Sequence, residues 1–180
     1  VDVMDRKRNT VTIKIDEEPG RANVEKMDKL RPAFEKDGTV TTGNASKIND
    51  GAAGVLLISE TKATELGFTP LVRIISQASA AQEPEWFTTA PIKAISKVLE
   101  KVGMEVADID LWEINEAFAP VAMAVMDDFN LDHSKVNVNG GAIALGHPIG
   151  ASGARILTTL IYALKSRDVT TGLATLCIGG

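Results

Sequence analysis

The spacing of hydrophobic positions changes repeatedly along the second part of the chain, between the periods typical of strands and of helices. Short apolar stretches of strand length occupy residues 71–76, 109–114, 136–138 and 173–177. Between them lie longer stretches with apolar positions at helical spacing, over residues 91–102, 116–129 and 150–164. Pro91 begins the first of these and Gly103 follows its end, as is common at helix termini. Strands that alternate with helices predict a layered α/β fold.

The first part of the chain has a different pattern. Residues 1–42 are rich in charged side chains and contain only short alternating runs, which indicates an irregular lobe. Small and turn-forming residues follow, and then the continuous apolar run Val55-Leu56-Leu57-Ile58 predicts a buried strand. A short helix over 61–66 is expected next, because Gly67 provides a natural helix end.

Composition narrows the class of protein. A chain of 180 residues, 44% hydrophobic and 4% aromatic, is large enough for a core packed mainly by aliphatic side chains. The net charge of -5 argues against general nucleic-acid binding, which needs a basic face. One cysteine excludes an internal disulfide framework. No apolar run approaches the roughly 20 residues that span a bilayer, and the first residues lack a signal-peptide pattern. We therefore expect a cytoplasmic protein with no membrane contact.

His147 lies in the glycine-rich stretch from Asn139 to Arg155, and this setting makes it the first candidate for chemistry. Gly146 precedes it and Pro148 follows, so its backbone is extended and a loop presents the imidazole. A lone histidine is more often structural or simply exposed, and that alternative stays open here. The glycines lack the Lys-Ser or Lys-Thr of phosphate-binding loops. The chain's other histidine, His133, and its one cysteine do not form a spacing typical of metal ligands with His147. We therefore expect no metal site.

Two other polar residues come at the ends of predicted strands. Asn115 follows the strand that ends at Ile114, and Cys177 ends the last strand. Ligands collect outside the carboxyl ends of strands in α/β sheets, so we expect both side chains near His147. Local sequence alone favours an N-cap role for Asn115 and a small apolar role for Cys177. Gly179 lets backbone N–H groups beside the thiol face a developing oxyanion.

Three motifs in the same order resemble the second half of a thiolase, the family that joins or cleaves acyl chains carried on coenzyme A. They are Asn139 to Arg155, Asn115-Glu116-Ala117-Phe118-Ala119 and Cys177-Ile178-Gly179-Gly180. The resemblance covers essentially the whole chain and implies a thiolase-like layered α/β fold, a mixed sheet with helices on both faces. It also implies three parts: a piece of the irregular coenzyme A-binding loop lobe (1–48), the last elements of the N-terminal domain (49–69), and the C-terminal domain, truncated at its end (70–180).

The resemblance implies a role for each motif residue. Cys177 is the acid/base that removes or returns the α-proton of the acyl thioester, and the Gly179 amide helps to bind an oxyanion. His147 activates the nucleophile and later completes an oxyanion hole. Asn115 holds a water that polarises a thioester carbonyl together with the histidine, while Glu116 orients the loop. A thiol suits proton transfer because its pKa, about 8.5 when unperturbed, can be tuned toward the working pH.

For the coenzyme A thioester, the resemblance implies Ser46 in the coenzyme A loop, Phe34 as an apolar contact, and Ala117 and Phe118 along the pantetheine arm. Arg21 is added as a phosphate partner on charge alone. The basic residues of this region are interspersed with acids, and a solvated face is the alternative. Departures from the family pattern are Thr42, Lys47 and the segment 17–26.

Together these features resemble the short-chain branch of the family, which condenses two acetyl-CoA to acetoacetyl-CoA and CoA, or runs the reverse thiolysis, by a ping-pong mechanism. Coenzyme A thioesters are then substrates, and no permanently bound cofactor is expected. Three alternatives remain: a degradative 3-ketoacyl-CoA thiolase with longer substrates, a non-catalytic acyl-CoA or lipid-binding relative, and a piece that serves only assembly. Family members assemble as dimers or dimers of dimers, so we expect a homodimer or homotetramer when intact.

The nucleophilic cysteine of the family belongs to its first half, and no cysteine precedes Cys177 in this chain. The opening Val1 is not an initiator methionine, and the last residues follow directly on a strand-like run. We therefore expect a fragment whose missing N-terminal half carries the nucleophile, and which is inactive alone.

Overall fold

The structure is a computed structural model that describes residues 1–16, 20 and 23–178. Two short parallel strands lie at its centre. Strand β3 (Leu111–Ile114) pairs with β4 (Gly172–Thr175), so that Leu111 lies opposite Gly172 and Ile114 lies opposite Thr175. Because the strands are parallel, their carboxyl ends lie at the same edge of the sheet. The residues that follow each strand therefore begin side by side.

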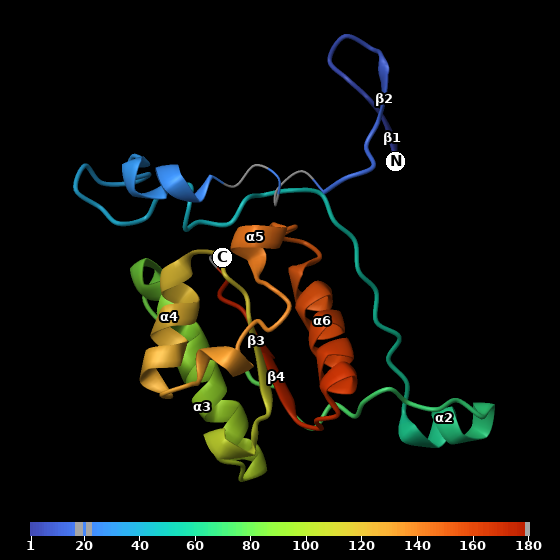
Figure 1. Cartoon of the computed structure of the whole chain (residues 1–180). Helices are drawn as coiled ribbons and strands as arrows, with labels where there is room; N and C mark the ends of the chain where they lie inside the picture. Colours follow the sequence, from blue (N-terminus) through green and yellow to red (C-terminus); the bar gives the residue numbers. More distant parts are fainter. Residues whose placement is uncertain (17–19, 21–22, 179–180) are drawn as a thin grey trace.

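Helices cover both faces of this strand pair. In Figure 1, α3 (Ala90–Val102) and α4 (Ala119–Asp128) lie on one side of β3 and β4, and α6 (Ser152–Arg167) lies on the other. The predicted α/β fold with helices on both faces is confirmed.

Alternation along β3 builds one core on each face. Trp112 and Ile114 belong to a cluster with side chains of α3 and α4, and both are at most 1% exposed. Leu111 belongs to the opposite cluster with Leu160 and Leu164 of α6. Each such side chain contributes about 1.5–3 kcal/mol when it is fully buried. The strand is therefore held by apolar contacts from two layers.

The long helices begin and end close to their predicted positions. Helix α3 has Pro91 in its first turn and ends at Gly103, whose φ of 67° lies in the left-handed region that glycine favours. Helix α4 begins at Ala119, later than the expected 116, because the Ala117 amide first donates to the Asn115 carbonyl in a tight turn. Apolar periodicity thus located the helices but not the turn that precedes α4.

The predicted strand over 136–138 is wrong beyond its first residue. Val136 forms a single parallel bridge with Trp112. Asn137 then takes a φ of 46°, so the backbone leaves the extended region and the ladder stops. The Asn137 side chain donates to the Ile114 carbonyl and accepts from the Ile114 amide, each at 2.8 Å. A side-chain amide therefore makes the bonds that a third strand would have made.

Two other predicted strands, over 55–58 and 71–76, are also wrong. Neither segment has regular secondary structure, and their apolar side chains are largely exposed, as at Leu56 (82%) and Leu71 (62%). A buried strand needs a neighbouring strand for its backbone and covering layers for its side chains. Within the described ranges, no strand pairs with either segment.

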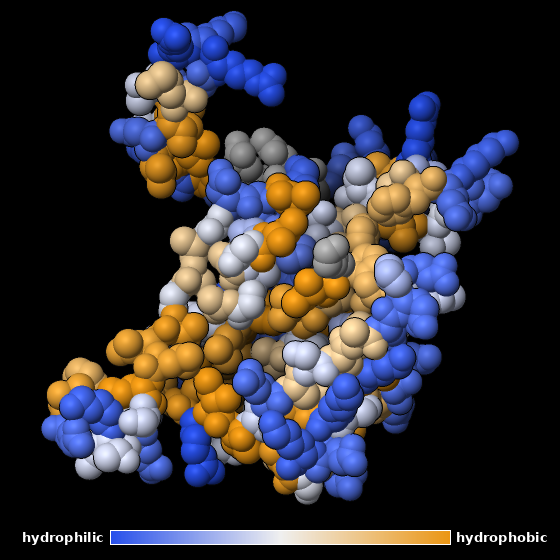
Figure 2. All heavy atoms as spheres, turned by 180° about the vertical axis from the view of Figure 1, so that it is seen from behind, coloured by the Kyte–Doolittle hydropathy of each residue, from blue (hydrophilic) through white to orange (hydrophobic). Residues whose placement is uncertain are grey.

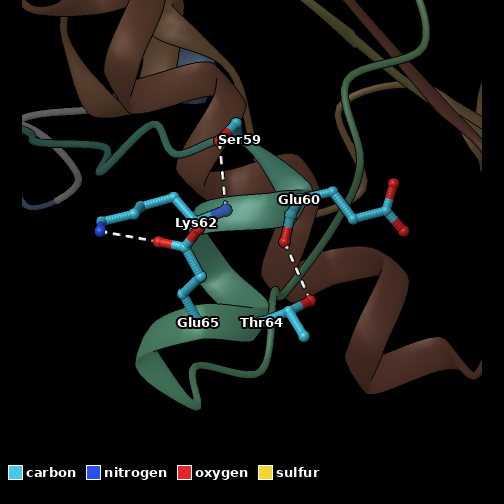
Figure 3. Close-up of polar contacts among 5 residues, drawn as sticks. All are labelled: Ser59, Glu60, Lys62, Thr64 and Glu65. Atoms are coloured by element: carbon cyan, nitrogen blue, oxygen red, sulfur yellow. Dashed lines mark hydrogen bonds and ion pairs between the residues drawn. The ribbon is translucent and has the colours of Figure 1, made fainter.

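The helix expected over 61–66 is confirmed as α2 (Glu60–Leu66), which projects from the rest of the chain in Figure 1. Figure 3 shows its polar contacts: the Ser59 hydroxyl accepts from the Lys62 amide at 3.2 Å, and the Lys62 ammonium pairs with Glu65 at 2.8 Å. Gly67 ends the helix with a φ of 68°. An N-cap contributes about 1 kcal/mol, so local bonds rather than packing define this element.

The remaining elements are short. An antiparallel hairpin of β1 (Asp2–Met4) and β2 (Thr10–Thr12) begins the chain, and Figure 1 places it away from the β3–β4 pair. The other short elements are η1 (Val24–Lys29), η2 (Pro84–Thr89), η3 (Val106–Asp108), η4 (His133–Lys135) and α5 (Ala142–Leu145). Among the described helices, not one has the length and apolar character needed to cross a bilayer.

An open apolar groove lies beside β4. The extended segment 69–78, strand β4 and the apolar faces of α3 and α6 line its volume of about 820 Å³. Figure 2 shows hydrophobic side chains gathered on this side, between the projecting α2 and the body of the chain. The apolar side chains of 71–76 thus face a groove instead of a neighbouring strand.

Replacing Ile114 by alanine should lower the free energy of unfolding by about 2–5 kcal/mol, because this side chain is fully buried between two layers. Leu56→Ala is the control, since Leu56 is 82% exposed, and it should change stability by less than about 0.5 kcal/mol. Urea denaturation followed by fluorescence of the buried Trp112 measures both. Equal losses in the two variants would contradict the core described above.

Candidate active site

The loop between α5 and α6 presents His147 toward the carboxyl ends of the strands. Gly146 has a φ of 97°, which an L side chain rarely adopts, and a Cβ there would also collide with Asn49. The His147 amide donates to the Lys47 carbonyl at 2.8 Å. The Gly-His-Pro order therefore places the histidine on a loop whose backbone is bound to a segment a hundred residues earlier in the chain.

The His147 imidazole is partly buried and contacts two side chains. Its Nδ1 lies 2.5 Å from Ser152 Oγ, and its Nε2 lies 3.2 Å from Asn115 Nδ2. Burial lowers the pKa of His147 below its ordinary value of 6.5, and the positive charge of Arg155 lowers it further. The imidazole is therefore neutral at pH 7, with a lone pair available to accept a proton. A merely exposed histidine is excluded by these contacts.

Asn115 is only 1% exposed and follows directly after β3. Its amide donates to the Thr175 carbonyl at 3.0 Å, which extends the β3–β4 pairing by one bond. The N-cap interpretation of Asn115 is wrong, because the N-cap of α4 is Phe118. Among the residues that the structure describes, Asn115 Oδ1 has no hydrogen-bond partner. A buried amide oxygen without a partner is the group expected to bind a ligand or a water.

Cys177 lies two residues beyond β4, at the same edge of the sheet as Asn115. It is 7% exposed and packs in the cluster that contains Ile114. Within the described part of the chain, its thiol has no hydrogen bond to His147 or Asn115. Burial raises the pKa of the thiol above its ordinary value, away from neutral pH and opposite to the expected tuning. Gly179 lies outside the described residues, so its predicted role stays a prediction.

Glu116 holds the glycine-rich loop in place. Its carboxylate accepts from the Ile143 amide and from the Asn137 side chain, each at 3.1 Å. Gly141 lies against this carboxylate so closely that a Cβ would fall 2.2 Å from it. The expectation that Glu116 orients the loop is confirmed by these contacts.

Four of the five residues predicted for coenzyme A form one continuous surface. The Ser46 hydroxyl and amide both donate to the Ala117 carbonyl, at 2.9 and 3.1 Å. Phe34 meets Phe118 edge to face, with ring centroids 5.8 Å apart, and remains 72% exposed. The fifth residue, Arg21, lies outside the described residues. Because the Lys47 carbonyl, next after Ser46, accepts from the His147 amide, this segment adjoins the loop that carries the imidazole.

Sequence reasoning missed three contributors to this site. Ser152 contacts His147 from the first residue of α6, where a serine five residues after a candidate histidine was the available signal. Asn137 acts through a local turn that apolar periodicity does not reveal. Lys47 acts through its carbonyl, and a backbone contact leaves no trace in the choice of side chain.

Glu113 is a buried carboxyl that the sequence did not single out. It lies on β3 and is 1% exposed, and its Oε1 has no hydrogen-bond partner among the described residues. Burial raises its pKa to about 7, although the positive charge of Arg155 opposes that shift. The described residues also contain no group of three His, Cys, Asp or Glu side chains that could hold a metal ion.

Family models match nearly all of the chain in two parts. A model described as the C-terminal domain of thiolase matches residues 68–180, and one described as the N-terminal domain of thiolase matches residues 1–61. This chain belongs to the thiolase family. The thiolase match therefore includes both the His147 loop and the segment that carries Ser46.

Individual thiolases share about half of this chain's residues. The chain is 55% identical to acetyl-CoA acetyltransferase of Allochromatium vinosum, with 100% of this chain and 46% of the relative covered. The acetyl-CoA acetyltransferase of Escherichia coli is 53% identical, with 100% and 46% covered. The chain thus spans about half the length of the curated relatives it matches.

Solved thiolase structures show the same fold. The crystal structure of the Bacillus anthracis acetyl-CoA acetyltransferase is 48% identical with a TM-score of 0.91, over 99% of this chain and 45% of that chain. Human mitochondrial 3-ketoacyl-CoA thiolase is 42% identical with a TM-score of 0.86, over 100% and 46%. Both names belong to those proteins, and the two names specify different acyl-CoA compounds.

Gly141→Ala should disrupt the loop of this thiolase chain, because the added methyl group would displace the Glu116 carboxylate from the Ile143 amide. We expect a loss of about 1–3 kcal/mol in the free energy of unfolding. Gly150→Ala is the matched control in the same loop, since a Cβ at Gly150 meets nothing within 4 Å. Its effect should stay within about 0.5 kcal/mol by urea denaturation. A harmless Gly141→Ala would show that Glu116 does not hold the loop.

Glu113 should make stability fall as pH rises. Its pKa of about 7 in the folded chain lies above the ordinary value of 4.5, so the folded state binds more protons between these values. The contribution of Glu113 to the free energy of unfolding therefore decreases from pH 4.5 to pH 7. Glu113→Gln should remove this part of the slope, measured as the difference from the parent chain by urea denaturation at each pH. Parallel pH curves for the two proteins would contradict the raised pKa.

Proposed function

We propose that this chain is the C-terminal part of an acetyl-CoA acetyltransferase, which condenses two acetyl-CoA to acetoacetyl-CoA and CoA or runs the reverse thiolysis. The observation that carries the proposal is the bond between the His147 amide and the Lys47 carbonyl. This bond joins the segment of Ser46 to the loop that carries the His147 imidazole, and in the proposal one thioester contacts both. Relatives with that name are 55% and 59% identical to the chain.

The proposed reaction has two half-reactions. A cysteine thiolate attacks the carbonyl carbon of the first acetyl-CoA and the C–S bond breaks. CoA leaves with the proton of the Cys177 thiol, which becomes a thiolate. The second acetyl-CoA gives its α-proton to the Cys177 thiolate, and the resulting carbanion attacks the acyl-cysteine. The cysteine leaves as a thiolate and takes back the proton held by His147, and acetoacetyl-CoA is released. Coenzyme A thioesters are substrates in this scheme, and no permanently bound cofactor takes part.

The residues of this chain have distinct parts in the scheme. Neutral His147 accepts the proton of the nucleophilic thiol at Nε2 and then, with Asn115, stabilises the enolate oxygen of the second thioester. The backbone amide of Gly179 stabilises the other oxyanion. Ser46, Phe34, Ala117 and Phe118 support the pantetheine arm, and Arg21 a phosphate. These assignments rest on the resemblance and on the contacts of Asn115, His147 and Ser46.

The nucleophile in this proposal belongs to residues outside this chain. The chain has one cysteine, Cys177, whose buried thiol has a raised pKa and already serves as the acid/base. The whole protein would carry the second cysteine in its other half. A cytoplasmic homodimer or homotetramer, and the division into residues 1–48, 49–69 and 70–180, complete the proposal.

A degradative 3-ketoacyl-CoA thiolase is the second candidate. The likeness to human mitochondrial 3-ketoacyl-CoA thiolase favours it, at a TM-score of 0.86 and 42% identity. Rates of thiolysis with acetoacetyl-CoA and with longer 3-ketoacyl-CoA separate the two enzymes. A non-catalytic acyl-CoA or lipid-binding protein would bind these thioesters without turnover.

The full-length protein should catalyse acetoacetyl-CoA thiolysis, and the 180-residue chain alone should not, because it lacks the proposed nucleophile. In the full-length protein, His147→Ala and Cys177→Ala should each lower kcat by about 10²–10⁴, since each removes a proton-transfer group. His133→Ala is the matched control, because this second histidine lies in η4, apart from the Asn115–His147 contact. The decrease in thioester-enolate absorbance measures all of these rates. Turnover by the 180-residue chain would refute the assignment of the nucleophile.

A further inference from the structure

Ser152 is a hydroxyl group that the proposed reaction does not use, and it is fully buried. It is the first residue of α6. Its Oγ lies 2.5 Å from His147 Nδ1 and 3.1 Å from the Pro148 carbonyl oxygen. A buried hydroxyl has one proton to donate, so the bonds around it are limited to a few combinations.

One combination satisfies every contact that the structure contains. The Ser152 hydroxyl donates to the Pro148 carbonyl, which has no proton of its own. His147 Nδ1 then donates to Ser152 Oγ, and His147 Nε2 accepts from Asn115 Nδ2. Three hydrogen bonds form without a conflict.

The opposite tautomer makes fewer bonds. If Ser152 donated to His147 Nδ1, its bond to the Pro148 carbonyl would be lost. Nε2 would then carry the proton and face the Asn115 NH₂ group, which is also a donor. Only a rotation of the Asn115 amide by 180° would bring its oxygen to accept from Nε2. Two bonds would remain at best. A buried polar group left without a hydrogen bond is unfavourable, so the first combination dominates.

We propose that Ser152 is a positioning residue, which holds His147 as the tautomer with its proton on Nδ1 and its lone pair on Nε2. This inference rests on the proposed function, because it assigns Nε2 as the atom that accepts the thiol proton. Ser152 does not touch the substrate and acts only through the histidine.

The tautomer matters because only an unprotonated Nε2 can act as a base toward the site. Without Ser152, the Nδ1 proton loses its buried acceptor, and a share of His147 takes the opposite tautomer. Holding a catalytic imidazole in one tautomer through its second nitrogen is worth up to about 10⁴ in kcat where the partner is a carboxylate. A neutral hydroxyl is a weaker acceptor, and we expect a loss of about 10- to 100-fold from Ser152→Ala.

The first experiment measures the tautomer directly in the full-length protein. Histidines labelled with ¹⁵N are observed by NMR, and the His147 signals are assigned by their loss in His147→Gln. We expect a protonated Nδ1 and an unprotonated Nε2 at pH 7, and a mixture in Ser152→Ala. Ser152→Thr keeps the hydroxyl and should restore the parent tautomer. A parent protein protonated at Nε2, or an unchanged tautomer in Ser152→Ala, would overturn the inference.

Thr158→Ala is the matched control. Thr158 lies on the same helix, and its hydroxyl also donates to a carbonyl four residues earlier, that of Ala154, at 2.7 Å. Its removal therefore costs α6 a similar bond without affecting His147. We expect the His147 tautomer and kcat to stay unchanged in this variant. A tautomer change in Thr158→Ala would show that Ser152→Ala acts by loosening the helix, which would contradict the inference.

The second experiment measures rates. Ser152→Ala should lower kcat for acetoacetyl-CoA thiolysis about 10- to 100-fold and leave KM within about 2-fold, because binding contacts remain. If kcat fell and KM rose by similar factors, the variant would have lost the structure of the whole site, and this result would contradict a positioning role. A full-length protein without turnover, but with a tautomer that depends on Ser152, would refute the proposed function and leave this inference standing.

Discussion

The parallel pairing of β3 with β4 determines where every other part of the site lies. It sets Ile114 opposite Thr175, so that Asn115 and Cys177 leave the sheet at one edge. Apolar layers on both faces hold this register, because a slip of one residue would bring Trp112 and Ile114 out of their cluster and Glu113 into it. Two strands of four residues each thus position chemistry that comes from distant segments.

Burial shifts the pKa values of His147 and Cys177 in opposite directions. It lowers the pKa of His147 and raises that of Cys177, and both shifts favour the uncharged form of the side chain. Both side chains are therefore uncharged at rest. During the proposed reaction, charge develops on a thioester oxygen or a thiolate, where fixed amide and imidazole dipoles stabilise it most strongly in a low dielectric.

Sequence patterns were sufficient for elements that stabilise themselves or carry their own end signals. The helices α3 and α6 have an apolar face, and α2 has a Ser59 cap and Gly67 at its end. The predicted strands over 55–58 and 71–76 are wrong, because a strand depends on neighbouring strands that a short stretch of sequence does not contain. The position of Asn115 and of His147 after predicted strands indicated that these residues meet, as the structure shows. The sequence did not predict Ser152 or the Lys47 carbonyl, because both act through geometry that only the folded backbone creates.

The apolar groove beside β4 affects how the chain behaves in aqueous solution. Its wall combines exposed aliphatic side chains with an edge of β4 that pairs with no other strand among the described residues. Surfaces of this kind adhere to one another and to chaperones, and they seed aggregates through edge-to-edge pairing. The 180-residue chain is therefore expected to associate with itself as its concentration rises, and a partner that covered the groove would suppress this association.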